Sequence, residues 1–93
     1  MRHVIFKNSF KKQYELFRRR GKDIKKLEAV IKLLAHDEPM PSSYKDHPLS
    51  GNFSGFRDCH IEPDWLLIYA KEPSEDKLGT LYLEATGTHS DLF

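Results

Sequence analysis

The feature that most constrains the fold is a pair of amphipathic helical patterns in residues 1–35, separated by only three residues. Their apolar positions recur every three to four residues, as expected for one face of a helix. The first stripe is Phe10, Tyr14 and Phe17, and the second is Ile24, Leu27, Ile31 and Leu34. A connection this short predicts two antiparallel helices whose stripes can cover one face of a sheet.

Residues that cap or break helices mark the ends of both patterns. Asn8 or Ser9 is a candidate N-cap for a first helix over residues 9–20, and Gly21 ends that helix. Asp23 can cap the second helix. Residues 4–6 form a short apolar run before the first helix, which predicts a first strand.

A β-hairpin is predicted further along the chain. Strands over residues 56–61 and 65–69 flank residues 62–64, where Pro63 suits the first corner of a turn. The predicted cross-strand pairs are Glu62 with Trp65, Ile61 with Leu66, and His60 with Leu67. The face toward the helices is then Cys59, Ile61, Leu66 and Ile68, and the opposite face is Asp58, His60, Trp65 and Tyr69.

The remaining segments complete the predicted order of elements. Residues 37–52 are rich in proline, serine and glycine and predict a long loop, and residues 71–79 predict a solvated turn. A last strand follows over residues 80–86, and Gly87 bends the chain so that His89 and Phe93 return over the sheet edge. The order is β-α-α-β-β-β. We therefore expect an α+β fold in which the helical hairpin packs on one face of a small, mostly antiparallel sheet.

Composition limits the class of protein. A chain of 93 residues with 31% charged and 39% apolar residues predicts a single domain over residues 1–93. Its apolar runs are far shorter than the ~20 residues that cross a bilayer, and its first residues do not match a signal peptide. Cys59 is the only cysteine, which excludes an internal disulfide. We expect a cytoplasmic protein without a membrane role.

Charge is unevenly distributed along the chain. Residues 1–35 contain eleven lysines and arginines against three acids, whereas residues 36–93 contain four against eleven. A basic surface attracts polyanions such as RNA, and it also attracts acidic protein partners. The run Arg18-Arg19-Arg20 has a simpler interpretation as a solvated helix end.

Three of the five histidines lie in segments rich in turn residues, where side chains can project toward a ligand. RNA carries its own nucleophile, the 2′-hydroxyl, so its cleavage needs a base, an acid and donors for the transition state. His47, His60 and His89 can serve in proton transfer, and Asp64 can act as a base or orient an imidazole. The aromatic faces that could hold bases are Trp65, Tyr69 and Phe93. This chemistry predicts a nuclease site that needs no metal or cofactor.

Each of these residues also has a structural interpretation. His47 can be a turn residue, His60 a buried polar group with its hydrogen bonds satisfied, and His89 a capping or surface group. Asp64 can belong to the turn and Trp65 to the core. A metal site is another alternative, although the spacing of the histidines matches no familiar ligand pattern.

Three segments in combination resemble the YafQ branch of the RelE-type toxins of bacterial toxin–antitoxin modules. They are residues 44–51 (YKDHPLSG), 55–69 (GFRDCHIEPDWLLIY) and 86–93 (TGTHSDLF). The resemblance implies a RelE-like, microbial ribonuclease-like fold. It also implies a ribosome-dependent endoribonuclease that cuts mRNA in the ribosomal A site.

The resemblance further implies roles for individual residues. The catalytic positions of the family match His47, His60, Asp64 and His89, and its aromatic site residues match Trp65 and Phe93. By this resemblance His89 is the general acid, and Asp64 or His47 is the base or its orienter. His60 positions the phosphate or balances charge.

The chain departs from the family at Ala85, where similar toxins usually carry arginine. Such an arginine supplies positive charge for the transition state, and the loss of a donor of this kind costs ~10²-fold or more in rate. We interpret Ala85 as an engineered change that lowers toxicity. Simple alternation places Ala85 on the face of Leu81 and Leu83, so a bulge or the end of the strand is needed to turn it toward the site.

Partners are implied in the same way. They are a cognate antitoxin of the DinJ type, mRNA and ribosomal RNA on the ribosome, and operator DNA only through the antitoxin complex. The candidate residues for RNA and ribosome binding are Lys11, Lys12, Arg18, Arg19, Arg20, Lys22, Lys25 and Lys26. Two alternatives use the same surface without catalysis: a binding module for RNA or an acidic antitoxin segment, and a small structural subunit.

Overall fold

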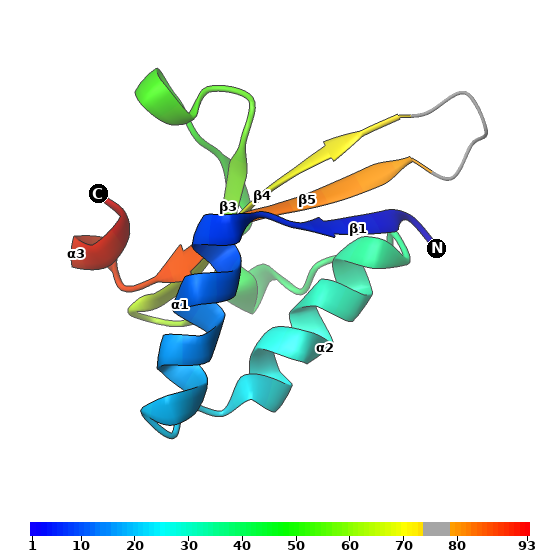
Figure 1. The fold of residues 1–93 in the computed structure, drawn as a ribbon. Coiled ribbons are helices and arrows are strands. Elements are labelled where there is room, and N and C mark those ends of the chain that lie inside the picture. Colours follow the sequence, from blue (N-terminus) through cyan, green and yellow to red (C-terminus); the bar gives the residue numbers. More distant parts are fainter. Residues whose placement is uncertain (74–78) are drawn as a thin grey trace.

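The computed structural model describes residues 1–73 and 79–93 (Figure 1). Its elements are β1 (His3–Phe6), α1 (Asn8–Arg19), α2 (Ile24–Ala35), β2 (His47–Pro48), β3 (Arg57–Glu62), β4 (Trp65–Glu72), β5 (Thr80–Gly87) and α3 (His89–Leu92). Two 3₁₀ turns, η1 (Ser42–Tyr44) and η2 (Gly51–Phe53), interrupt the segment between α2 and β3. No helix of this described part of the chain is long and apolar enough to cross a membrane.

The strands form one sheet in the order β1-β5-β4-β3-β2. β1 runs parallel to β5, and the other neighbouring pairs are antiparallel. Helices α1 and α2 lie side by side against one face of this sheet (Figure 1). The predicted α+β architecture and the predicted order of the longer elements are therefore confirmed. The predicted turn over residues 71–79 falls mostly outside the described residues.

The sequence did not predict two short elements that shape the opposite face. β2 has two residues, too few to show a periodic pattern. α3 is a single turn, closed by a capping box in which the Thr88 side chain accepts from the Asp91 N–H and the Asp91 side chain accepts from the Thr88 N–H. β2 depends on its pairing with β3, whereas α3 is closed by local hydrogen bonds.

The helix ends follow the predicted signals at one helix and depart from them at the other. The Asp23 side chain accepts a hydrogen bond from the Lys25 N–H and caps α2, as predicted. Gly21, at φ +82°, lies just beyond the end of α1. Lys7 occupies the N-cap position of α1 without a side-chain cap, so the prediction of Asn8 or Ser9 as the cap was wrong. Ser9 instead donates its hydroxyl to a carbonyl of β5.

The carbonyl that accepts from Ser9 is that of Glu84, which lies at one of two register irregularities among the described strands. The β3–β4 register shifts between His60 and Glu62, so Ile61 is an extra residue on β3. The β4–β5 register shifts between Ile68 and Tyr69, which leaves Glu84 as an extra residue on β5. The Ser9 hydroxyl donates to the Glu84 carbonyl at 2.6 Å, and this bond satisfies a backbone group that the bulge leaves without a ladder partner.

Because of the bulge at Ile61, part of the predicted hairpin pairing was wrong. His60 lies opposite Leu66, and Cys59 lies opposite Leu67, one residue away from the predicted pairing. The predicted faces are right for β3 and wrong for β4. Trp65, Leu67 and Tyr69 pack in the core under the helices, whereas Leu66 and Ile68 lie on the other face.

The core lies between the helices and the sheet. Among the described residues, its buried members are Phe10, Phe17, Leu27, Val30, Leu34, Ala35, Cys59, Ile61, Trp65, Leu67, Tyr69, Leu81 and Leu83. Both predicted helical stripes contribute to it. The rings of Phe17 and Trp65 are 5.4 Å apart between centroids, which joins α1 to β4 at the end of the sheet that carries the hairpin turn.

Candidate active site

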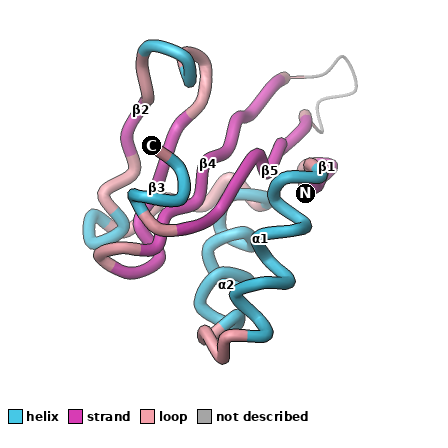
Figure 2. The backbone as a smooth tube through the Cα atoms, turned by 60° about the vertical axis from the view of Figure 1, so that its left-hand side comes forward, coloured by secondary structure: helices cyan, strands magenta, loops and turns pink. Residues whose placement is uncertain are grey.

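Three histidines from separate segments meet on the face of the sheet opposite α1 and α2. His47 comes from β2, His60 from β3 and His89 from α3. The ring centroids are 6.3 Å apart between His47 and His60, and 5.6 Å apart between His60 and His89. Figure 2 shows β2, β3 and the C-terminal turn gathered on one side, away from the two long helices. The geometry brings together the residues that the sequence singled out.

His89 forms a pair with Asp64, which lies in the turn between β3 and β4. The ring Nδ1 of His89 is 2.6 Å from Asp64 Oδ1, and the backbone N–H of His89 donates to the same oxygen at 2.9 Å. These two bonds, the backbone bond first, lower the pKa of the Asp64 carboxyl. Because an ionised carboxylate only accepts, the proton at this contact is on Nδ1 of His89, and Nε2 faces away from the pair.

His47 is oriented by the backbone of its own loop. Its Nδ1 lies 2.7 Å from the carbonyl oxygen of Lys45 and 3.2 Å from Asp58 Oδ1. A ring N–H points in one direction and a carbonyl only accepts, so the shorter contact is the hydrogen bond and Nδ1 carries the proton. In the neutral ring this arrangement leaves the lone pair on Nε2.

Asp58 is a site residue that the sequence reasoning placed on the correct face but did not include in the candidate site. Its side chain is buried, and its Oδ1 has no hydrogen-bond partner within residues 1–73 and 79–93. Burial raises the pKa of this carboxyl, and the charges of His47, His60 and His89 act in the opposite direction. Its position two residues before His60 on a strand was the available signal, since such residues share a face.

Ala85 lies in a row of residues that crosses the sheet beneath the histidines. His47 is opposite Asp58, Asp58 is opposite Ile68, and Ile68 is opposite Ala85. The bulge at Glu84 turns Ala85 to this face, which confirms that an irregularity separates it from Leu83. Ala85 is buried, with 7% of its surface exposed. A longer side chain at this position would extend along a row that ends in a carboxylate and an imidazole.

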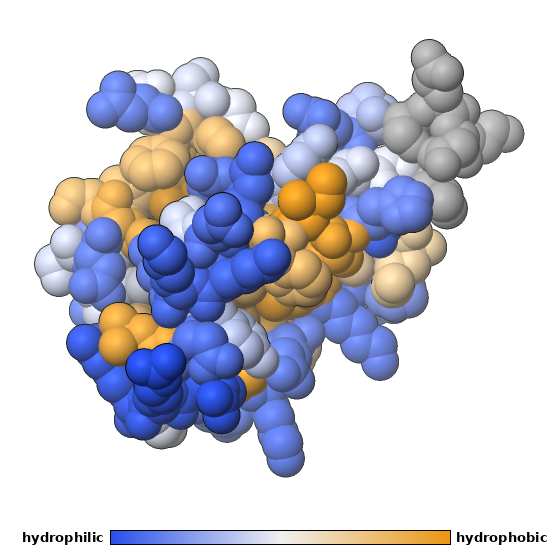
Figure 3. Space-filling model, in the orientation of Figure 1, coloured by the Kyte–Doolittle hydropathy of each residue, from blue (hydrophilic) through white to orange (hydrophobic). Residues whose placement is uncertain are grey.

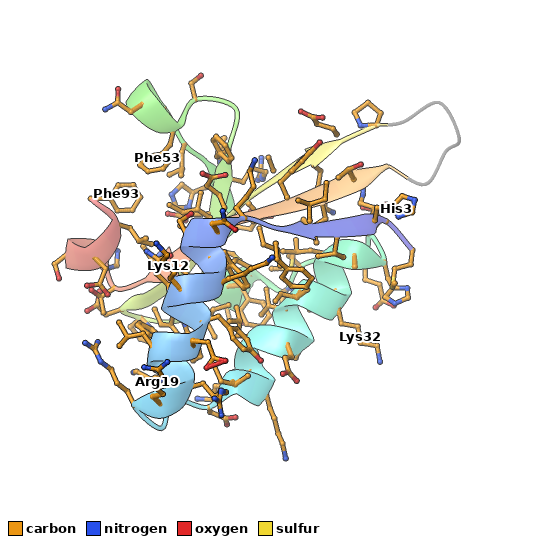
Figure 4. The ribbon with its side chains drawn as sticks, in the orientation of Figure 1. His3, Lys12, Arg19, Lys32, Phe53 and Phe93 are labelled. Atoms are coloured by element: carbon orange, nitrogen blue, oxygen red, sulfur yellow. The ribbon has the colours of Figure 1, made fainter. Side chains whose placement is uncertain are left out.

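The three aromatic candidates occupy different environments, and two of them, Trp65 and Tyr69, are buried in the core and present no face to a base. Trp65 is fully buried, and its indole Nε1–H donates to Thr86 Oγ1 at 2.9 Å. Its expected role as a stacking surface was wrong, because the bulge at Ile61 turns it into the core. Phe93 is 61% exposed, and its ring is 5.5 Å from that of Phe53 (Figure 4). Phe53 was not among the predicted site residues, and no pattern in the sequence linked it to Phe93.

The predicted basic surface is present but partly neutralised. Figure 3 shows hydrophilic side chains gathered over α1 and its C-terminal end. Lys22 and Lys26 both contact Glu62, at 3.3 and 3.1 Å, and Arg18 contacts Glu15 at 2.9 Å. The other predicted basic residues, all exposed, are Lys11, Lys12, Arg19, Arg20 and Lys25. In Figure 4 Lys12 extends from α1 toward the side of the molecule that carries Phe93.

A pocket of about 250 Å³ adjoins His60. Tyr44, Lys45, His60 and Glu62 are among its lining residues. It combines an aromatic ring, a cation, an imidazole and a carboxylate in one hollow. Within the described residues, no group of three or more histidine, cysteine or acidic side chains is arranged to hold a metal ion.

Comparison with known proteins gives a consistent result. A family model described as the bacterial toxin YafQ of type II toxin–antitoxin systems matches residues 2–93. The chain is 44% identical over 93 residues to the mRNA interferase toxin YafQ of Escherichia coli strain K12, a match that covers 99% of this chain and 96% of the relative.

Two solved structures show the same fold. The YafQ chain in a crystal structure of the E. coli DinJ–YafQ complex is 42% identical, with a TM-score of 0.85, and the match covers 100% of this chain and 99% of that one. A metal-bound toxin from Helicobacter pylori is 38% identical, with a TM-score of 0.87 and complete coverage of both chains. The similarity extends along the whole length of both relatives.

Proposed function

The chain belongs to the YafQ family of bacterial type II toxins, within the RelE superfamily, and on this premise we propose that it is a ribosome-dependent endoribonuclease that cleaves mRNA. The convergence of His47, His60 and His89 beside Asp64 on one face of the sheet carries this proposal. RNA supplies the nucleophile, so paired proton donors and acceptors suffice for the chemistry and no metal takes part.

His47 is the general base in this mechanism. Its Nδ1–H is held by the Lys45 carbonyl, which leaves Nε2 to accept the proton of the ribose 2′-hydroxyl. As that oxygen attacks the adjacent phosphorus, the bond to the 5′-oxygen breaks.

His89 is the general acid that protonates the leaving 5′-oxygen. Asp64 holds the proton on Nδ1 and fixes the orientation of the ring. Its lowered pKa makes Asp64 a weak base, so we assign it the role of orienter. His60 lies between the two other rings and places a third imidazole beside the scissile phosphate.

Ala85 lowers the activity of this chain. The transition state carries extra negative charge on the phosphate oxygens, and a fixed cation next to it contributes to the rate. Alanine supplies neither charge nor donor, whereas an arginine at this position would start from the row that leads to Asp58 and His47. We propose that the engineered loss of such an arginine makes the chain a weakened toxin.

The basic surface of α1 serves association with RNA and protein. It docks on ribosomal RNA through exposed lysines and arginines and is neutralised when a cognate antitoxin of the DinJ type binds. Operator DNA is contacted only through the toxin–antitoxin complex. These partners place the site of action in the cytoplasm, where ribosomes and mRNA meet.

Cleavage of mRNA on programmed ribosomes tests this function. The chain and its Ala85→Arg variant are compared, with the expectation that arginine raises the rate by roughly 10²-fold. Cleavage should persist in a chelator selective for transition metals, since the mechanism uses none. If Ala85→Arg arrests growth without cutting mRNA, the chain is a noncatalytic binding module instead.

A further inference from the structure

The proposed base, His47, lies in the least regular part of the described chain. β2 consists of two residues, and its pairing with β3 is limited to His47 with Asp58 and Pro48 with Arg57. So short a strand at the edge of a sheet is weakly held by its own ladder. The precise placement that acid–base catalysis requires must therefore come from other contacts.

Asp46, the residue before β2, makes such contacts. Its Oδ1 accepts a hydrogen bond from the Tyr69 hydroxyl at 2.6 Å and another from Arg57 Nε at 3.2 Å. Tyr69 is 2% exposed and is part of the core under the helices. Burial and the bond to Asp46 raise the pKa of the Tyr69 phenol, so it remains a donor. One carboxylate thus ties the loop to the rigid centre of the sheet.

The backbone connects this attachment to the ring of His47. Lys45 adopts the left-handed conformation, at φ +49°, and its carbonyl accepts the Nδ1–H of His47 at 2.7 Å. A non-glycine residue in this region costs energy and persists when its neighbours are held. Asp46 lies between Lys45 and His47, so fixing its side chain restrains both ends of the bond that selects the His47 tautomer.

We propose that Asp46 is a positioning residue, clasped by Tyr69 and Arg57, that holds His47 with its proton on Nδ1 and its Nε2 free to act as the base. This inference rests on the proposed function for its catalytic meaning, while its structural part stands on the contacts alone. The Tyr69 bond carries most of the effect, because it is shorter and partly buried, whereas the Arg57 side chain is 44% exposed and such surface pairs are weak.

The decisive variant is Tyr69→Phe, which removes the donor and keeps the ring that fills the core. The matched control is Tyr14→Phe, which removes the hydroxyl that donates to Glu28 on the far side of the molecule. Nitrogen-15 NMR of the histidine rings reads the tautomer of His47 directly in the folded protein. We expect Tyr69→Phe to convert His47 to a mixture of tautomers and Tyr14→Phe to leave it unchanged. An unaltered His47 signal in Tyr69→Phe would overturn the proposal.

A second arm measures cleavage in the Ala85→Arg background. Tyr69→Phe should lower kcat by about 10-fold and leave KM within about twofold, since RNA binding does not use the clasp. In the His47→Ala background the same substitution should have no further effect, because the clasp acts through His47. Independent, additive losses would refute the positioning role.

Asp46→Ala removes the same hydrogen bond without changing a core residue, so it separates loss of the bond from disturbance of the core. Asp46→Asn still accepts from Tyr69 and should retain most of the parent rate. If Asp46→Ala leaves both the tautomer and kcat intact, the proposal fails. Should Ala85→Arg show no cleavage at all, the proposed function fails, and the NMR measurement still decides whether the clasp exists.

Discussion

The two faces of the sheet differ in how completely their buried polar groups are hydrogen-bonded. On the face under α1 and α2, the indole N–H of Trp65 and the hydroxyl of Thr86 are both buried and both hydrogen-bonded. On the other face, Asp58 is buried with one oxygen that no described residue bonds. A buried carboxylate oxygen without a donor destabilises a fold. The comparison teaches that one face supplies stability, while the other gives up some of it at the residues of the proposed site.

The largest effect expected on the face that carries the histidines is the loss of His89, the proposed general acid. In the Ala85→Arg background, His89→Ala should lower mRNA cleavage by roughly 10³-fold, because the leaving oxygen loses its proton donor. Its thermal midpoint should stay close to that of the parent, since the His89 side chain is exposed.

His3→Ala provides the matched control. His3 is an exposed histidine at the opposite end of the sheet (Figure 4), so its removal should leave cleavage unchanged. Equal cleavage by His89→Ala and His3→Ala would mean that the histidine cluster is not the reactive site.

On the packed face, the largest expected effect is on stability. Trp65→Ala should lower the free energy of unfolding by about 3–5 kcal/mol, because it empties the space between β4 and α1 and leaves Thr86 with one partner fewer. Urea denaturation measures the change. Phe93→Ala removes another aromatic ring, but an exposed one, and should cost less than ~0.5 kcal/mol. A small loss in Trp65→Ala would contradict the assignment of Trp65 to the core.

Asp58 is expected to affect both stability and cleavage. Its folded-state pKa is raised, so the folded protein binds its proton more tightly than the unfolded chain, and stability falls as pH rises above the usual value of 3.8. Asp58→Asn should therefore add about 1 kcal/mol to the free energy of unfolding at neutral pH and lower cleavage. Denaturation curves at pH 4 and pH 7 measure this. If Asp58→Asn is less stable than its parent at pH 7, the buried Asp58 carboxylate does not destabilise the folded protein.

A smaller effect, with the opposite dependence of stability on pH, is expected at Asp37, just beyond the end of α2. Hydrogen bonds from Lys71 and then Arg2 lower the pKa of Asp37 from 3.8 to about 2. Its contribution is present at neutral pH and is lost as pH falls from about 4 toward about 2. Because the side chain is half exposed, Asp37→Asn should cost less than about 1 kcal/mol at pH 7. The cost should shrink to a small fraction of its pH 7 value at pH 2, and a cost that is undiminished there would exclude the ion pairs as its cause.

Much of the fold and part of the site followed from sequence patterns. The helical stripes, the Asp23 cap and the Pro63 turn are local signals, and each predicted the element that forms. The histidines and Asp64 were recognisable from residue type and motif. Trp65 and Tyr69 were assigned to the wrong face because simple alternation breaks down once Ile61 is inserted in β3. Asp58 and Phe53 were not included because their significance comes from partners on other segments.

The amino-acid sequence by itself determined which segments become the longer helices and strands and which titratable groups the protein carries, since propensity and periodicity act between near neighbours. The tertiary structure alone decided which residues share a face, where the bulges at Ile61 and Glu84 fall, and which nitrogen of His47 and His89 carries the proton. The reason is physical. Register and hydrogen-bond partners are set by contacts between residues far apart in the chain, and no local pattern encodes those contacts.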